Sequence, residues 1–343
     1  MVQFVGVPQM RAWVSEVGPE RIIAGLTEAV EQDLLHWRRF DKIPRVASHS
    51  PVGVIELMPT SDGSLYAFKY VNGHPSNPSR GLQTVTAFGM LADVATGYPL
   101  LVSEMTVLTA LRTAATSAVA ARALARKDSR VHALIGAGSQ SEFQAIAIRV
   151  ALGINTVRVF DTDPEAIAKF ERNARSLGFD VYRASSAADA VEGADIVTTC
   201  TADKSNAHVL EASMIAPGTH INAIGGDCPG KTELDVDILH AAGVIAVEFE
   251  PQTRIEGEIQ QLEANHPVTA LWDVLAGAAA GRTADADITV FDSVGFAMED
   301  FSALRFLRDS VSGTHWVEEI DIVAEPQDPK DLFSLAMAPI LTR

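Results

Sequence analysis

A glycine-rich turn between a strand pattern and a helix pattern has the most direct chemical meaning in the sequence. Gly136 and Gly138 follow the apolar run 131–135 and precede a helical pattern over 140–152. The first glycine permits a tight turn, the second lets a pyrophosphate approach the backbone, and the helix N-terminus offers free N–H groups to the phosphates. Ser141 stands where a third glycine is expected, so the motif by itself also fits an ordinary connection.

Asp161 follows the next predicted strand, 156–160, and lies 25 residues after Gly136. A carboxylate roughly 20 residues beyond this kind of turn accepts hydrogen bonds from the adenosine ribose. Its charge also repels a 2′-phosphate, so the pattern predicts NAD rather than NADP. The alternative is that Asp161 caps the helix that begins at Pro164, and the complete strand-helix-strand context favours the ribose role.

Two further polar turns follow later strands, at the edge where doubly wound sheets bind ligands. One begins at Thr199, and the other, 222–227, reads Asn-Ala-Ile-Gly-Gly-Asp. Gly225 and Gly226 would let the backbone approach a nicotinamide, and Asp227 would stand beside it. By itself Gly-Gly-Asp is more often an ordinary turn.

The composition limits the partners of the chain. With 27 Lys and Arg against 44 Asp and Glu, the net charge is −17, which disfavours nucleic acid because like charges repel. Cys200 and Cys228 are the only cysteines, and their spacing indicates neither a disulfide framework nor a metal site. Residues 1–14 lack the apolar core of a signal peptide, and no apolar run reaches the roughly 18 residues of a membrane span. We expect a cytoplasmic protein without a membrane partner.

The elements that must position these residues fall into two groups, because 343 residues exceed one typical core. From residue 131 onward strands alternate with helices, which is typical of a doubly wound parallel sheet. The predicted strands are 131–135, 156–160, 180–182, 196–199, 220–224, 244–247 and 288–291, and the predicted helices are 140–152, 164–177 and 187–192.

The rest of the chain predicts an α+β unit with an antiparallel or mixed sheet. Its predicted helix is 19–37, and its predicted strands are 52–58, 65–71, 84–93, 100–102 and 320–323. A small-residue helix over 106–125 precedes the alternating strands and helices, and a helix over 294–309 leads out of them. We therefore expect a Rossmann-type domain over 114–319. It is inserted into a substrate-binding and dimerisation domain formed by 1–113 with 320–343.

Six longer stretches carry a family resemblance: RVASHS from Arg45, VIELMP from Val54, AFKYVNGHP from Ala67, ALRTAATS from Ala110, GGDCPGKTEL from Gly225 and EPQTRIEGE from Glu250. With these in order, nearly the whole chain resembles the ornithine cyclodeaminase/mu-crystallin family. The resemblance implies conversion of L-ornithine to L-proline and ammonia, with a bound NAD that is reduced and reoxidised within one turnover. It also implies a homodimer built through the substrate-binding domains.

The resemblance implies roles for individual residues as well. Arg45, Lys69 and Arg112 match positions that bind the substrate carboxylate, Asp227 matches the catalytic acid/base at the substrate, and Val294 matches a position that lines the substrate pocket. The expected cofactor contacts, including the glycine turns, are Thr84, Arg112, Gly136, Gly138, Ser139, Gln140, Asp161, Thr201, Asn222, Ala223, Ile224, Gly225, Lys231 and Ser293.

The chemistry of ornithine agrees with these roles. A hydride leaves Cα readily only if the attached amine is neutral, so a base is needed near Cα, and Asp227 beside the nicotinamide can accept that proton. Cations from separate elements would hold the carboxylate so that the Cα–H bond faces the nicotinamide. Attack of the neutral δ-amine on the α-imine then closes the ring and releases ammonia, and the cyclic imine takes the hydride back.

Three points stay open. Glu56 shares a domain with Lys69 and is a hypothetical ligand of the distal ammonium of ornithine, although a solvated strand residue is an equal alternative. An NAD(P)-dependent amino-acid dehydrogenase or a cyclic-imine reductase would carry many of the same residues. A mu-crystallin-like binding protein is a third possibility, and the presence of Lys69, Arg112 and Asp227 argues against it.

Overall fold

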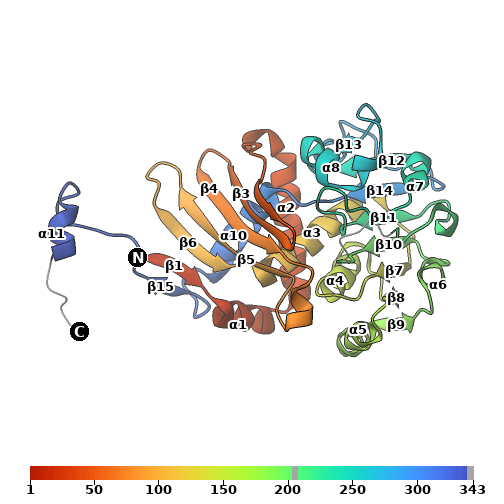
Figure 1. Ribbon diagram of the computed structural model, residues 1–343, viewed down its shortest axis with the longest axis horizontal. Coiled ribbons are helices and arrows are strands. Elements are labelled where there is room, and N and C mark those ends of the chain that lie inside the picture. Colours follow the sequence, from red (N-terminus) through yellow and green to blue (C-terminus); the bar gives the residue numbers. More distant parts are fainter. Residues whose placement is uncertain (203–207, 338–343) are drawn as a thin grey trace.

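The computed structural model describes residues 1–202 and 208–337. Two sheets lie side by side, and helix α3 (Thr106–Leu124) runs between them (Figure 1). We call them the parallel sheet and the mixed sheet. The predicted combination of a doubly wound sheet with an α+β unit is confirmed.

The parallel sheet contains only parallel strand pairs among the described residues. Its strands, in spatial order, are β13 (Thr269–Ala270), β12 (Val244–Val247), β14 (Thr289–Asp292), β11 (His220–Ala223), β10 (Ile196–Thr199), β7 (Val131–Ile135), β8 (Thr156–Phe160) and β9 (Asp180–Arg183). The chain runs from β7 outward to β9 and then returns to β10 on the other side of β7. The carboxyl ends of β7 and β10 therefore flank the switch point, where such sheets bind ligands.

Helices cover both faces of the parallel sheet. One face carries α4 (Ser141–Leu152) and α5 (Pro164–Ser176), and the other carries α6 (Ala187–Val191) and α7 (Val236–Ala241). Side chains of β7 divide between two cores, since Leu134 packs in one cluster with Ile146 while Ile135 packs in another with Ile238. This explains why the strands are apolar on both faces.

In Figure 1 the mixed sheet lies to the left of α3, and the parallel sheet lies to its right. Its strands, in spatial order, are β15 (Glu318–Ile320), β1 (Val2–Val5), β6 (Pro99–Glu104), β5 (Val85–Asp93), β4 (Leu65–Gly73), β3 (Gly53–Ser61) and β2 (Val46–Ser50). Only β1 and β6 pair in parallel among its described strands. Helix α10 (Ala297–Val311) packs on β3, β4 and β5, and α2 (Pro19–Leu35) packs on both α10 and α3.

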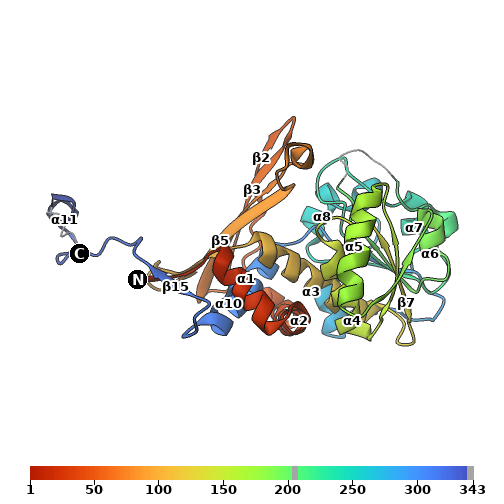
Figure 2. The ribbon, with the colours of Figure 1, turned by 90° about the horizontal axis from the view of Figure 1, so that it is seen from below.

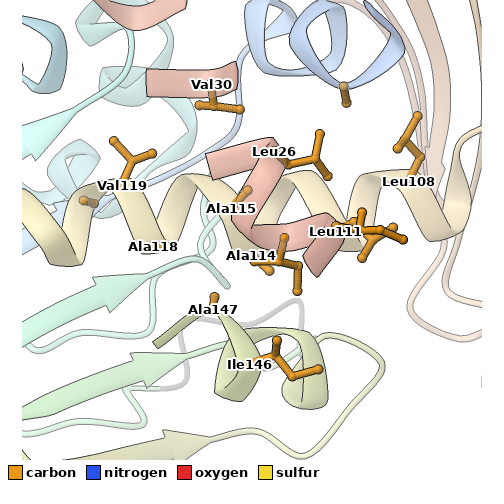
Figure 3. Packing of buried hydrophobic residues seen from close by; sticks show 14 of the residues in the cluster. Leu26, Val30, Leu108, Leu111, Ala114, Ala115, Ala118, Val119, Ile146 and Ala147 are labelled. Atoms are coloured by element: carbon orange, nitrogen blue, oxygen red, sulfur yellow. The ribbon is translucent and has the colours of Figure 1, made fainter. Parts of the chain in front are cut away.

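Small side chains let α3 pack closely against helices of both units. Figure 3 shows Ala114, Ala115 and Ala118 of α3 in a cluster with Leu26 of α2 and Ile146 of α4. Because alanine keeps helix surfaces close, α3 contacts helices of the two units along its length. The predicted small-residue helix over 106–125 is confirmed to within one residue.

The remaining elements are helices. They are α1 (Val7–Val17), α8 (Glu250–Glu256), α9 (Leu271–Leu275), α11 (Leu332–Met337) and the 3-10 helices η1 (Trp37–Arg39), η2 (Asn77–Arg80), η3 (Ala212–Met214) and η4 (Glu258–Gln261). Figures 1 and 2 both show α11 standing apart from the rest of the molecule. No helix among the described residues is long and apolar enough to cross a membrane.

Three predicted elements need correction. The final strand is β15, which shares only Ile320 with the predicted range 320–323, because its antiparallel pairing with β1 sets Val2 opposite Ile320 and Phe4 opposite Glu318. The outgoing helix begins at Ala297 rather than at Val294, because Gly295 has a φ of +73°. The predicted helix 19–37 ends at Leu35.

The domain limits after residues 113 and 319 stay a prediction, and positions 338–343 of the predicted C-terminal segment lie outside the described residues. The return of the chain to the first unit is visible in the β1–β15 pairing. Packing alone would group α10 with the mixed sheet, since α10 contacts β3, β4 and β5.

Candidate functional site

The glycine turn after β7 leaves room for a ligand to approach its backbone closely. Gly136 has a φ of +105°, and a Cβ there would lie 2.8 Å from the carbonyl oxygen of Cys200. A Cβ on Gly138 would meet nothing within 4 Å. Gly136 is therefore required by the neighbouring β10 turn, whereas Gly138 leaves space at the start of α4, where Ser139 and Gln140 lie.

Asp161 ties the end of β8 to this turn. Its Oδ2 accepts a hydrogen bond from Ala137 N at 2.6 Å, and its Oδ1 accepts one from Asp163 N at 2.9 Å. The cap of α5 is Asp163, which accepts from Glu165 N at 2.9 Å, so the capping alternative for Asp161 is wrong. The carboxylate stands beside the glycine turn, as the ribose prediction requires.

The turns after β10 and β11 meet at the same edge of the parallel sheet. Lys231 Nζ lies 3.2 Å from Thr201 O and 3.3 Å from Asp227 Oδ1. Glu233 accepts hydrogen bonds from the N–H and the hydroxyl group of Thr201. Lys231 thus connects the β10 turn to the Asp227 carboxylate, whose side chain is 58% exposed.

Buried carboxylates support the Asn222–Asp227 segment from behind. A Cβ on Gly225 would collide with the Glu233 carboxylate, and one on Gly226 would lie 2.7 Å from Glu258 Oε1. These glycines are therefore required by the protein side of the turn, which the sequence did not reveal. On the other side, Ile224 N donates to Thr199 O at 3.1 Å and Ser293 N donates to Ala223 O at 3.0 Å.

Glu258 and Asp292 continue this carboxylate layer into the core. Asp292 accepts from Glu258 N at 2.9 Å and from Ile259 N at 2.8 Å, and Glu258 accepts from Glu233 N at 2.7 Å. Burial raises the pKa of Asp292 to about 7, and burial together with the nearby Asp292 charge raises the pKa of Glu258 to about 8. Sequence reasoning missed both residues, although Glu258 ends the stretch EPQTRIEGE.

On the mixed-sheet side, one carboxylate brings two predicted cations together. Lys69 of β4 and Arg112 of α3 both contact Asp300 Oδ1, at 2.8 Å from Lys69 Nζ and 2.9 Å from Arg112 Nε. Arg112 Nη1 also lies 2.7 Å from Glu299 Oε2. Burial and the neighbouring Arg112 charge lower the pKa of Lys69 to about 8. Glu299 and Asp300, in the first turn of α10, were missed from the sequence.

Arg45 joins the two units. Its Nη1 lies 3.2 Å from Glu56 Oε2 and its Nε lies 3.2 Å from Glu256 Oε2. Its Nη2 donates to Val294 O at 2.9 Å and to Gly295 O at 2.8 Å. Glu56 is buried in an ion pair, so the solvated-strand alternative is wrong, while its role toward the substrate stays a prediction.

Gly295 explains why the segment before α10 is not helical. Its φ is +73°, and a Cβ there would lie 2.8 Å from Arg112 Nη1. The segment places Val294 and Gly295 against Arg45 and places Ser293 against the buried Glu248. Thr84 lies just before β5, with its carbonyl accepting from His74 N at 2.8 Å, and its cofactor contact stays a prediction.

Two of the buried polar atoms without a partner belong to residues predicted to contact the cofactor. Gln140 Oε1 beside the glycine turn and Asn222 Nδ2 at the end of β11 have no hydrogen-bond partner among the described residues. With the open space at Gly138 and the Asp161 carboxylate, these groups fit a dinucleotide laid across the switch point. No cluster of His, Cys, Asp and Glu suited to a metal ion occurs in the described part of the chain.

Together these groups can orient a small amino acid between the two units. Buried cations of the mixed-sheet unit suit a carboxylate, and the exposed Asp227 at the sheet edge suits proton transfer beside a nicotinamide. The remaining carboxylates, Glu56 and Glu256, suit a second amino group.

Known proteins are similar to this chain in sequence and in fold. The ornithine cyclodeaminase of Agrobacterium fabrum is 58% identical over 337 residues, which cover 98% of this chain and 95% of that protein. A lysine cyclodeaminase that recognises L-lysine, L-ornithine and L-2,4-diaminobutyric acid has 33% sequence identity to this chain. Its structure gives a TM-score of 0.90 over 97% of this chain and 99% of that chain.

A dimeric archaeal alanine dehydrogenase with bound NAD is 32% identical, with a TM-score of 0.83 over 94% of this chain and 99% of that chain. The model of the ornithine cyclodeaminase/mu-crystallin family matches residues 7–315. This family match covers most of both units and all of the site described above. The chain therefore belongs to the ornithine cyclodeaminase/mu-crystallin family.

Proposed function

We propose that the chain is an NAD-dependent ornithine cyclodeaminase, which converts L-ornithine to L-proline and ammonia. The observation that carries the proposal is that each of the two units contributes charged residues suited to one step of this reaction. Lys69 and Arg112 are buried in the mixed-sheet unit, where both contact Asp300, and Asp227 stands at the edge of the parallel sheet. The high identity to ornithine cyclodeaminases supports the substrate.

In this proposal two cations bind the substrate carboxylate, and the Asp227 carboxylate accepts a proton from the substrate. Lys69 and Arg112 bind the substrate carboxylate, and Asp300 keeps the two cations at one place. Asp227 accepts the proton of the α-ammonium, which makes the α-amine neutral. Lys231 keeps the Asp227 carboxylate over the β10 turn.

NAD supplies reversible removal of a hydride from Cα when it is bound. Gly136, Gly138, Ser139 and Gln140 would receive its pyrophosphate and Asp161 its ribose. Asn222 to Gly225, with Thr201, Lys231 and Ser293, would surround the nicotinamide half.

The experiment is to incubate the protein with L-ornithine and a catalytic amount of NAD. The proposal predicts equal amounts of proline and ammonia, with no net gain in absorbance at 340 nm. Steady NADH production from alanine would instead favour an amino-acid dehydrogenase. Reduction of an added cyclic imine without ornithine turnover would favour a reductase, and NAD binding without turnover would favour a binding protein.

The proposal includes a homodimer through the mixed sheet. Val46, Leu57, Tyr70 and Phe88 form one row across four neighbouring strands, because each is the register partner of the next. Val46, Leu57 and Phe88 are exposed, and the rings of Tyr70 and Phe88 stack with centroids 5.0 Å apart. Such an apolar row supports a protein interface. Sedimentation at several concentrations tests it, and a monomer at every concentration would contradict it.

A further inference from the structure

Glu256 is a buried carboxylate to which the proposed function assigns no role. It is the last residue of α8, and its side chain is 10% exposed. Its Oε2 lies 3.2 Å from Arg45 Nε, but no described residue donates a hydrogen bond of good geometry to that oxygen. The carboxylate therefore retains capacity to accept a proton donor inside the site.

The charges around Glu256 do not balance. Arg45 is a favourable charge beside it, whereas Glu56 on β3 and Asp227 on the turn after β11 both act as like charges. Three carboxylates against the Arg45 guanidinium and the Lys231 ammonium that contacts Asp227 leave a net charge of about −1 at this point if all are ionised. Burial first, and then the Glu56 and Asp227 charges, raise the pKa of Glu256 to about 7 in spite of Arg45. A cationic group of a ligand would restore the balance.

We propose that Glu256 binds the distal amine of the diamino acid and accepts its proton before ring closure, with Glu56 as the second carboxylate of this subsite. The inference rests on the proposed function and deepens it. Asp227 cannot serve both amines, since one carboxylate can accept one proton and Asp227 is assigned to the α-amine. Glu256 faces the same site from a different element, so the two bases can act on the two ends of one substrate.

The proton balance of ring closure agrees with two bases. The distal ammonium gives one proton to Glu256, and its freed electron pair forms the new bond to the carbon of the α-imine. The bond from that carbon to the original α-nitrogen then breaks, and ammonia leaves after it takes a proton from the ring nitrogen. The cyclic imine takes the hydride back at Cα and becomes proline. Glu256 then returns its proton to the ring nitrogen and Asp227 returns its proton to ammonia, so both carboxylates end as they began.

The test compares Glu256→Gln with Glu250→Gln, which removes an exposed carboxylate at the other end of the same helix. We expect Glu256→Gln to lower the turnover of L-ornithine about 100-fold, in the range of a lost general base. L-norvaline has the same chain length and no distal amine, so its competitive inhibition constant should change less than about twofold. Glu250→Gln should leave both quantities unchanged, and Glu256→Asp should restore part of the turnover.

A pH profile separates proton transfer from simple support of the fold. In the wild-type protein kcat/KM for L-ornithine should fall as the pH decreases through about 7, because protonated Glu256 accepts no proton. This acidic limb should be absent in Glu256→Gln.

Two results would overturn the inference. One is wild-type turnover in Glu256→Gln, and the other is an equal loss of L-norvaline binding, which would indicate a structural role. If the wild-type protein makes no proline from ornithine, the proposed function fails and the inference fails with it. Proline formation by an unaffected Glu256→Gln variant overturns the inference alone.

Discussion

Lys231 Nζ lies 3.3 Å from Asp227 Oδ1, and the lysine is buried while the aspartate side chain is 58% exposed. The same ammonium donates to Thr201 O at 3.2 Å. The buried Lys231 ammonium, which is held at the β10 turn, thus orients the exposed Asp227 carboxylate on the β11 turn. This is the geometry expected of a base that must reach a substrate without moving.

Asp227→Asn keeps the size of the side chain and removes its basicity. We expect the rate of proline formation to fall by roughly 10²- to 10⁴-fold, as for the loss of a general acid/base. Asp237→Asn is the matched control, since Asp237 is exposed on the nearby α7. A wild-type rate in Asp227→Asn would show that the base has been wrongly assigned.

Asp161→Ser removes the negative charge at the end of β8 and keeps a small polar side chain. Affinity for NAD should fall about tenfold, and affinity for NADP relative to NAD should rise, because the repulsion of a 2′-phosphate is lost. Fluorescence titration with both cofactors measures the ratio. Asp163→Ser is the control, because serine can still cap α5. An unchanged ratio in Asp161→Ser would exclude a ribose contact.

Asp300→Asn removes the charge that Lys69 and Arg112 share in the core. The side chains of Lys69 and Asp300 are both 1% exposed, so water cannot replace the lost partner. We expect the free energy of unfolding to fall by about 3–5 kcal/mol in urea titrations. Asp309→Asn lies on the same helix at an exposed position and should change it by less than about 0.5 kcal/mol. Equal stability of the two variants would argue against Asp300 as the charge that stabilises both cations.

The buried carboxylates predict that stability decreases as the pH rises. The folded-state pKa values of about 7 for Asp292 and about 8 for Glu258 lie above their ordinary values. Between about pH 5 and pH 8 the unfolded chain has released these protons and the folded chain retains them, so each group lowers the unfolding free energy by up to about 1.4 kcal/mol per pH unit. Glu258→Gln should flatten this decline, and parallel curves for the two proteins would contradict the assignment.

The sequence predicted the regular elements of the parallel sheet well, because its strands are apolar runs bounded by turn residues. Strands β7, β8, β10 and β12 begin and end where the pattern indicated. It failed at β1 and β15, which are short and depend on pairing between the two ends of the chain. It also placed the start of α10 three residues too early, because Gly295 has a positive φ and lies against Arg112, which is far away in the sequence.

The residues of the candidate site also divide into those that the sequence predicted and those that it did not. Residues with a recognisable motif, such as Gly136, Asp161 and Asp227, could be named from the sequence. Their partners could not, because Asp300, Glu256 and Glu258 become functional candidates only through contacts between distant segments. A carboxylate in a helix has no sequence signal that distinguishes a solvated face from a buried ion pair.

The central claim is that the hydride removed from Cα returns to the same substrate. L-ornithine deuterated at Cα, incubated with a catalytic amount of unlabelled NAD, tests it most directly by mass spectrometry of the product. The proposed function predicts proline that retains one deuterium at Cα, together with unlabelled NAD at the end. Proline with hydrogen at Cα, or deuterium accumulating in the cofactor, would contradict the proposal.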